Sequence, residues 1–284
     1  MRQAYYTHLL ALRLVQVSEE AVARNEQNLQ RAQAFFTVGT RPKIDVTRAQ
    51  VDLANAKLAL VQARNQALTT LAALNNAIGV PNYPPYRLVE ALEIPVTIGA
   101  FEDSTRAALA NRTEIQAAQA RVRVSEANLK VAQRHFFPIL NANASWSYSG
   151  QEFPLASNWT AGVFLEVPAL DPPRFAQLNE ATANLAAARA SEETVKHNVL
   201  LEVQQIYADL ISARESIEAA SVLLQQAHEN LALAQGRYEV GVGPLIDVTD
   251  AQLAFTQAET QDIQARVNFK RAEARLRKAT GAVE

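Results

Sequence analysis

One fifteen-residue stretch decides the organisation of the chain because it occurs twice: Tyr238-Glu239-Val240-Gly241-Val242-Gly243-Pro244-Leu245-Ile246-Asp247-Val248-Thr249-Asp250-Ala251-Gln252. Its counterpart lies 202 residues earlier, at Phe36-Thr37-Val38-Gly39-Thr40-Arg41-Pro42-Lys43-Ile44-Asp45-Val46-Thr47-Arg48-Ala49-Gln50. The register holds without a gap from Asn28/Asn230 to Gly79/Gly281, with 21 identities in 52 positions. The sequence therefore contains a duplicated unit that is much longer than a solenoid repeat.

Apolar residues after each copy recur alternately every three and four positions, the spacing of a coiled-coil seam. After the second copy they are Ala251, Phe255, Ala258, Ala265, Phe269, Ala272, Leu276 and Ala279, interrupted only by Asp262. This spacing predicts a helix over 247–280 and a matching helix in the first copy, with tips at 37–45 and 236–246. The absence of Gly and Pro between Arg174 and Gln235 predicts one long helix over 174–235, and a further helix is expected over 113–136.

Two short segments change to a period of two, which predicts a β-hairpin over 138–168. Each strand has an apolar face, and its length matches the 9 to 11 residues that a tilted strand needs to cross a bilayer. The tryptophans and the tyrosine near the turn are typical of an interfacial aromatic girdle. The residues predicted to face lipid are Leu140, Ala142, Ala144, Trp146, Tyr148, Trp159, Ala161, Val163, Leu165 and Val167.

Composition excludes several function classes. The 284 residues carry a net charge of -2, so the chain has no net positive charge to attract the phosphates of a nucleic acid. The absence of cysteine excludes disulfides, thiolate zinc sites and cysteine nucleophiles. The four histidines lack ligand spacing, and no catalytic motif occurs, so no enzyme activity, metal or cofactor is expected. The sequence contains no run of about 18 apolar residues, so no transmembrane helix is expected.

The repeated tip motif, the helix opening Asn111-Arg112-Thr113-Glu114-Ile115-Gln116 and Phe137-Pro138 before the hairpin resemble the TolC-like outer membrane efflux family. The resemblance covers the whole chain. It implies a homotrimeric tube, with strands in a transmembrane β-barrel and long antiparallel coiled-coil helices in a periplasmic α-barrel. The expected fold class is therefore mainly α with one β-hairpin.

The repeat divides the chain into three parts: 1–79 as the C-terminal part of the first repeat, 80–103 as an inter-repeat linker, and 104–284 as the complete second repeat. Tyr83-Pro84-Pro85-Tyr86 lies in this linker. Because the second unit begins near Ser104, subtracting 202 places the start of the first about a hundred residues before Met1. We expect that upstream segment to hold the first helix, the first hairpin, the start of the long helix that ends over residues 3–36, and any signal peptide. Six strands from three copies are too few for an outer-membrane barrel, which starts at eight.

The carboxylates of the tips have two interpretations. From spacing alone, Asp45 and Asp247 are expected to cap the returning helices, and Asp250 to be a solvated residue of the first turn. The resemblance implies that Asp247 and Asp250 line the pore aperture, where three chains would form a cation-selective ring. Arg48 replaces Asp at the position matching Asp250 and is a candidate partner for it. Relatives often carry a gate-locking arginine where Gly243 stands.

The resemblance also implies that the tips dock a periplasmic adaptor protein through Val38, Gly39, Thr40, Asp45, Val240, Gly241 and Val242. Asp52 and Glu259 are interpreted as ordinary helix-surface charges. The expected function is an outer-membrane exit duct of a tripartite efflux pump or type I secretion system in a Gram-negative bacterium. It would be a passive conduit driven by an inner-membrane transporter, with lipid around the hairpin. The alternative is a soluble periplasmic coiled-coil scaffold or adaptor, in which the hairpin is a small β cap.

Overall fold

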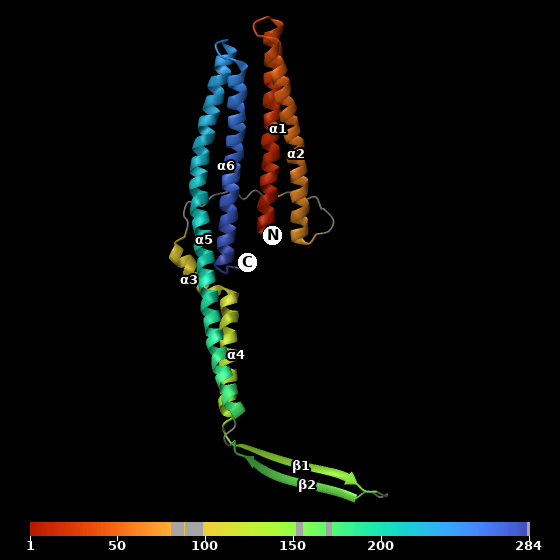
Figure 1. The fold of residues 1–284 in the computed structure, drawn as a ribbon. Helices are drawn as coiled ribbons and strands as arrows, with labels where there is room; N and C mark the ends of the chain where they lie inside the picture. The colour runs from red at the N-terminus through yellow and green to blue at the C-terminus, as the bar shows by residue number, and fades with distance from the viewer. Residues whose placement is uncertain (81–87, 89–98, 152–155, 169–171, 283–284) are drawn as a thin grey trace. The chain divides into compact units, whose positions relative to one another are not determined.

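The computed structural model describes residues 1–80, 88, 99–151, 156–168 and 172–282 (Figure 1). The described residues form six helices and two strands. In chain order they are α1 (Arg2–Thr37), α2 (Lys43–Ile78), α3 (Phe101–Asn111), α4 (Thr113–Arg134), β1 (Ile139–Ser149), β2 (Ala156–Glu166), α5 (Pro172–Glu239) and α6 (Leu245–Ala279).

The helix bounds differ slightly from those expected. The long helix α5 begins two residues before the expected 174 and ends four residues after the expected 235, so the second tip is only five residues long. Helix α4 ends at Arg134, two residues before the expected 136. Most of the expected linker, including Tyr83 to Tyr86, lies outside the described residues, and its last three residues begin α3.

The coiled-coil seam of the second repeat is confirmed. Every residue of the series in α6 is buried apart from the partly buried Leu276, and the interrupting Asp262 is buried as well. The seam packs against α5 in a cluster that includes Leu231, Tyr238, Val248 and Phe255. Alanine at alternate seam positions leaves room for the two helices to approach closely.

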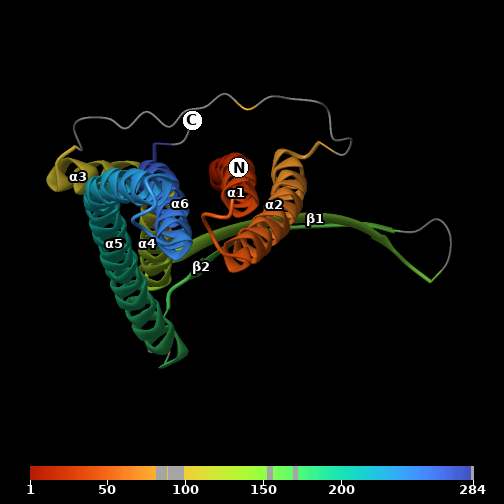
Figure 2. The same cartoon turned by 90° about the horizontal axis from the view of Figure 1, so that it is seen from above.

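The described chain divides into two compact units, Met1–Arg106 with Glu202–Glu284, and Ala107–Leu201. In the first unit, α1 runs antiparallel to α2, and α5 runs antiparallel to α6 (Figure 1). Seen from above, α1 lies between α2 and α6, so the first helix of repeat one faces the second helix of repeat two (Figure 2). The two repeats therefore meet along α1 and α6.

The second unit holds α3 from Ala107 onward, α4, the hairpin and the first part of α5. Arg174 joins the hairpin to the helices, since its guanidinium donates one hydrogen bond to the carbonyl of His135 and another to Glu166. Phe136 and Phe175 pack beside this point, with ring centroids 5.1 Å apart. The turn from α4 into β1 is thus tied to the start of α5.

The fold is mainly α with one antiparallel β-hairpin, as expected. In the part of the chain that the structure describes, none of the helices combines the length and the apolar character needed to cross a membrane.

Candidate functional site

The hairpin gathers its apolar side chains on one face. The ladder pairs Leu140 with Leu165, Ala142 with Val163, Ala144 with Ala161, and Trp146 with Trp159. Directly paired residues of an antiparallel sheet point to the same side, so the two apolar series predicted from the sequence form one continuous surface. The two indoles are 73% and 77% exposed. Tyr148 pairs with Ser157, and Val167 follows the end of β2 outside the ladder.

The opposite face of the hairpin is mainly polar and carries two large apolar residues, Ile139 and Phe164. The Phe164 ring lies 3.1 Å from the place where a Cβ would stand on Gly162, and Asn143 lies 3.2 Å from the same point. Phe164 therefore covers a neighbouring glycine of its own strand.

The two tips have the same backbone design. Gly39 and Gly241 adopt left-handed conformations, with φ of 77° and 85°. This region disfavours residues that carry a Cβ, so glycine is required at both tips. Pro42 and Pro244 then hold extended backbone at the N-caps of α2 and α6.

An arginine of the first tip reaches the second. The Arg41 guanidinium donates hydrogen bonds to the backbone carbonyls of Gly243 at 2.8 Å and Tyr238 at 3.3 Å. It also lies over the Tyr238 ring at 4.8 Å, while Phe35 meets the same ring edge-on at 5.5 Å. Position 41 is the repeat counterpart of position 243, so the first tip carries an arginine where the second carries a glycine.

Tyr238 and Asp45 are both buried where the tips meet. Burial raises the pKa of Tyr238, the Asp45 carboxylate raises it further, and Arg41 lowers it. Among the described residues, the Tyr238 hydroxyl has no hydrogen-bond partner. The phenol is therefore held neutral between an anion and a cation.

The expected capping role of Asp45 and Asp247 is wrong. The N-caps are Pro42 and Pro244, and neither helix has a side-chain cap hydrogen bond. Each aspartate is the third residue of its helix, where a carboxylate still interacts favourably with the helix dipole. The prolines occupy the N-cap positions because an N-cap residue has extended backbone, which proline adopts readily.

Asp250 is exposed and Asp247 partly buried, so the structure leaves both accessible within one chain. Asp250 and Arg48 form no ion pair in the described part of the chain; instead, both act on Asp52. Burial raises the pKa of Asp52, Arg48 lowers it and Asp250 raises it. Asp52 is therefore not an ordinary surface charge, because it faces the second repeat.

Polar side chains join the two repeats along α1 and α6, and the sequence did not reveal them. The contacts pair Arg24 with Glu259, Asn28 with Gln252, and Thr7 with Arg271. The Arg24–Glu259 ion pair is 2.8 Å long and mostly shielded from solvent. Glu259 was expected to be a surface charge, and this contact corrects that interpretation. Burial raises its pKa, while Arg24 lowers it.

The predicted docking residues occupy the ends of the tips. Val38, Val240 and Val242 are all exposed, whereas Asp45 is buried beneath them. Gly39 and Gly241 have open space where a Cβ would stand. The tips thus present exposed apolar side chains on a backbone fixed by glycine and proline.

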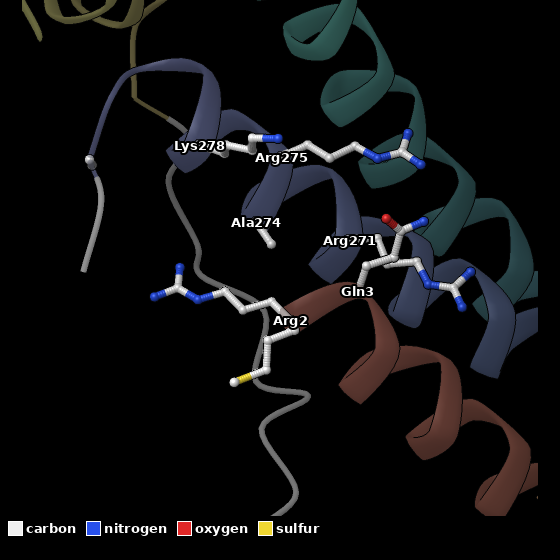
Figure 3. Close-up of a pocket in the computed structure, with 8 residues that line it drawn as sticks. Arg2, Gln3, Arg271, Ala274, Arg275 and Lys278 are labelled. Atoms are coloured by element: carbon white, nitrogen blue, oxygen red, sulfur yellow. The ribbon is translucent and has the colours of Figure 1, made fainter. Parts of the chain in front are cut away.

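A cavity of about 380 Å³ lies between the start of α1 and the end of α6. Its lining includes Arg2, Gln3, Arg271, Arg275 and Lys278 (Figure 3). The guanidinium groups do not converge, since Arg271 donates a hydrogen bond to Thr7 of α1, Arg275 extends toward α5, and Arg2 points the other way (Figure 3). We therefore assign no ligand to this cavity.

Comparison with known proteins places this geometry in a family. The family model described as outer membrane efflux protein matches residues 1–80 and 105–282. The toluene efflux pump outer membrane protein TtgF of Pseudomonas putida is 24% identical over 273 residues, covering 93% of this chain and 56% of that protein. The chain thus spans little more than half the length of the curated relatives it matches.

Solved structures show the same fold. The outer membrane protein VceC of Vibrio cholerae superposes with a TM-score of 0.80 at 17% identity, covering 99% of this chain and 68% of that one. A membrane protein from Pseudomonas aeruginosa gives a TM-score of 0.79 at 23% identity, covering 98% and 64%. Because the family model matches most of the sequence in two blocks that follow the repeats, the chain belongs to the outer membrane efflux protein family.

Proposed function

We propose that this chain forms part of an outer-membrane exit duct, a passive conduit through which an efflux or secretion system releases its substrates. The observation that carries the proposal is the hairpin, whose whole apolar face is exposed while its other face is mainly polar. A soluble β cap would leave this surface in water at a high free-energy cost. Lipid on the apolar side and a water-filled lumen on the polar side satisfy both faces.

The proposed assembly is a homotrimer in the outer membrane of a Gram-negative bacterium, with its helices in the periplasm. Both edges of the two-stranded sheet lack partners among the described strands, and strands in lipid need a closed ladder. Three such hairpins supply six strands, fewer than the eight of the smallest outer-membrane barrels, so closing the ladder needs strands besides those of the other copies. Family membership supports this arrangement, and no catalytic role is proposed.

The tips are the proposed docking site of a periplasmic adaptor, which would connect the duct to an inner-membrane transporter. Their exposed valines supply apolar contact area, and the fixed backbone reduces the entropy lost on binding. Asp247 and Asp250 are proposed to line the aperture. Six carboxylates in a narrow opening would attract cations and repel anions.

The hairpin proposal is tested by vesicle flotation of the full chain with matched lysine substitutions. Val163→Lys places a charge near the middle of the apolar face and should weaken partitioning by about 2–4 kcal/mol. Thr160→Lys, on the polar face of the same strand, is the control and should float like the parent. Equal flotation of both variants would mean that the apolar face does not contact lipid, and would favour the soluble scaffold.

The aperture proposal is tested by single-channel recording on the assembled protein. Replacing both Asp247 and Asp250 by Asn should remove most of the cation preference. Neither carboxylate makes a hydrogen bond or ion pair within the described chain, so the double change should leave the helix intact. An unchanged reversal potential would place the selective constriction elsewhere.

A further inference from the structure

The aromatic residues of the hairpin differ in chemistry between its two ends. At the turn end, Trp146 pairs with Trp159, and Tyr148 lies one row closer to the turn. An interfacial aromatic girdle normally carries tryptophan and tyrosine at both membrane surfaces. At the helix end of this hairpin the aromatic residues are all phenylalanine, namely Phe136, Phe137, Phe164 and Phe175. Rings that carry an N–H or O–H group are therefore concentrated near the turn.

The rings near the turn form an open platform. Trp146, Trp159 and Tyr148 are all exposed, and the rings of Trp146 and Tyr148 lie 6.5 Å apart with planes inclined by 32°. The next row toward the helices pairs Ala144 with Ala161, whose methyl groups are too short to cover the indoles. The faces of the rings are thus available to a partner.

The platform belongs to one leaflet of a bilayer. Leu140 and Tyr148 lie on the same face of β1, about 27 Å apart along an extended strand. A tilted strand of this length crosses most of an apolar band that is about 25 Å tall. In the proposed duct the helices lie in the periplasm, so the turn and its aromatic residues reach the outer leaflet.

The hairpin has no cation that could bind a phosphate headgroup. The sequence contains neither Lys nor Arg from 135 to 173. These side chains are the usual partners of phosphate in proteins. Acyl chains do not satisfy the platform either, because an indole N–H is a donor and finds no acceptor among them. A sugar ring meets both needs, since its C–H groups stack on an aromatic face and its hydroxyl oxygens accept hydrogen bonds.

We infer that Trp146, Trp159 and Tyr148 bind the saccharide headgroup of a glycolipid in the outer leaflet. This inference rests on the proposed outer-membrane duct and adds the class of lipid that its turn end contacts. The two indoles supply stacking faces and N–H donors, and the Tyr148 hydroxyl adds a group that both donates and accepts.

Vesicle binding by the full chain tests the inference, with tryptophan fluorescence as a local probe. The sequence contains only two tryptophans, and both belong to the platform. Three kinds of vesicle are compared: phosphatidylcholine alone, phosphatidylcholine with phosphatidylglycerol, and phosphatidylcholine with a glycolipid that carries a short oligosaccharide. The second kind controls for negative charge.

We expect the chain to bind the glycolipid vesicles about tenfold more tightly than the phosphatidylglycerol vesicles, the gain that two aromatic contacts of ordinary strength supply. Its tryptophan emission should also be better shielded from acrylamide in the glycolipid vesicles. The double variant Trp146→Phe with Trp159→Phe keeps the aromatic rings but removes both N–H groups, and should lose most of this preference. Leu140→Ala, at the helix end of the same face, is the control and should weaken binding to all vesicles equally.

The outcomes separate this inference from the proposed duct. Flotation with every kind of vesicle, but with equal affinity and equal acrylamide shielding in the two charged kinds, would overturn the saccharide site and leave the duct standing. A preference that survives in the double variant would also overturn it. A chain that floats with none of the vesicles would overturn both proposals.

Discussion

Replacing Arg41 by alanine should loosen both tips at once. The side chain makes two charge-assisted hydrogen bonds and one cation–π contact, all with the other repeat. Hydrogen bonds to charged groups contribute about 1.5–3 kcal/mol when buried, and a cation–π contact adds about 0.5–1 kcal/mol at an exposed site. Arg41 is only partly buried and its bond to Tyr238 is long, at 3.3 Å, so we count only the 2.8 Å bond to Gly243 and the cation–π contact. Taken at the lower end of each range, they give an expected loss of about 2 kcal/mol.

The assay is hydrogen–deuterium exchange of the two tip segments, 38–42 and 240–244. A loss of about 2 kcal/mol in local opening free energy should speed exchange about thirtyfold where opening requires the tips to separate. The amides of Val242 and Gly243 are the most informative, because both donate to the Arg237 carbonyl beside the Arg41 contact.

Two control variants sharpen this measurement. Arg31→Ala removes an exposed ion pair with Glu239, which also joins the repeats but should contribute no more than about 1 kcal/mol. Arg41→Lys keeps the charge but not the planar fork, so it should lose most of the protection as well. Equal exchange in Arg41→Ala and Arg31→Ala would show that Arg41 does not hold the tips together.

Three further outcomes follow from single residues. Gly241→Ala should destabilise the chain by about 1–2 kcal/mol because its φ is positive, whereas Gly236→Ala, inside α5 with open space around it, should stabilise by about 0.5–1 kcal/mol in the same urea titration. Burial lowers the pKa of His8 from its ordinary 6.5, so the native state binds fewer protons than the unfolded state just below that pH. The free energy of unfolding should then fall on acidification through this range, and His8→Gln should flatten the dependence in melts followed by circular dichroism. Glu259→Gln removes the close negative partner of the shielded Arg24, which then keeps only the longer, 3.6 Å ion pair with Glu20. The change should cost about 1–3 kcal/mol, part of which the added change Arg24→Gln recovers; full additivity of the two changes would contradict a direct pair.

Periodicity predicted most of the helical core and both faces of the hairpin. Positions such as Ala258 and Phe269 on α6 face α5, which the chain reversal at the tip places beside α6. The local spacing of apolar residues was therefore enough to predict their burial. The sequence also placed Trp146 and Trp159 on the apolar faces of two alternating strands on either side of one turn, and the ladder pairs them. In both cases the partner lies in the adjacent element.

Contacts between the repeats could not be predicted in this way. Asn28 and Gln252 are separated by 224 residues, and the side of α1 that faces α6 depends on how two finished hairpins pack together. The capping error has a local cause, because a proline or an aspartate can each begin a helix and the sequence holds both within four residues. Only the backbone shows that Pro42 occupies the N-cap and Asp45 the third helical position.

The contact between Arg41 and Gly243 joins positions that descend from the same ancestral residue. In a ring of identical single repeats, a mutation at this position would have appeared at every tip, so a large cation would always have met another large cation. Once two repeats were fused in one gene, each could mutate independently. A donor could then be kept on one tip and a bare backbone acceptor on the other. The duplication thus allows neighbouring tips to carry different, complementary residues at equivalent positions, which identical repeats cannot do.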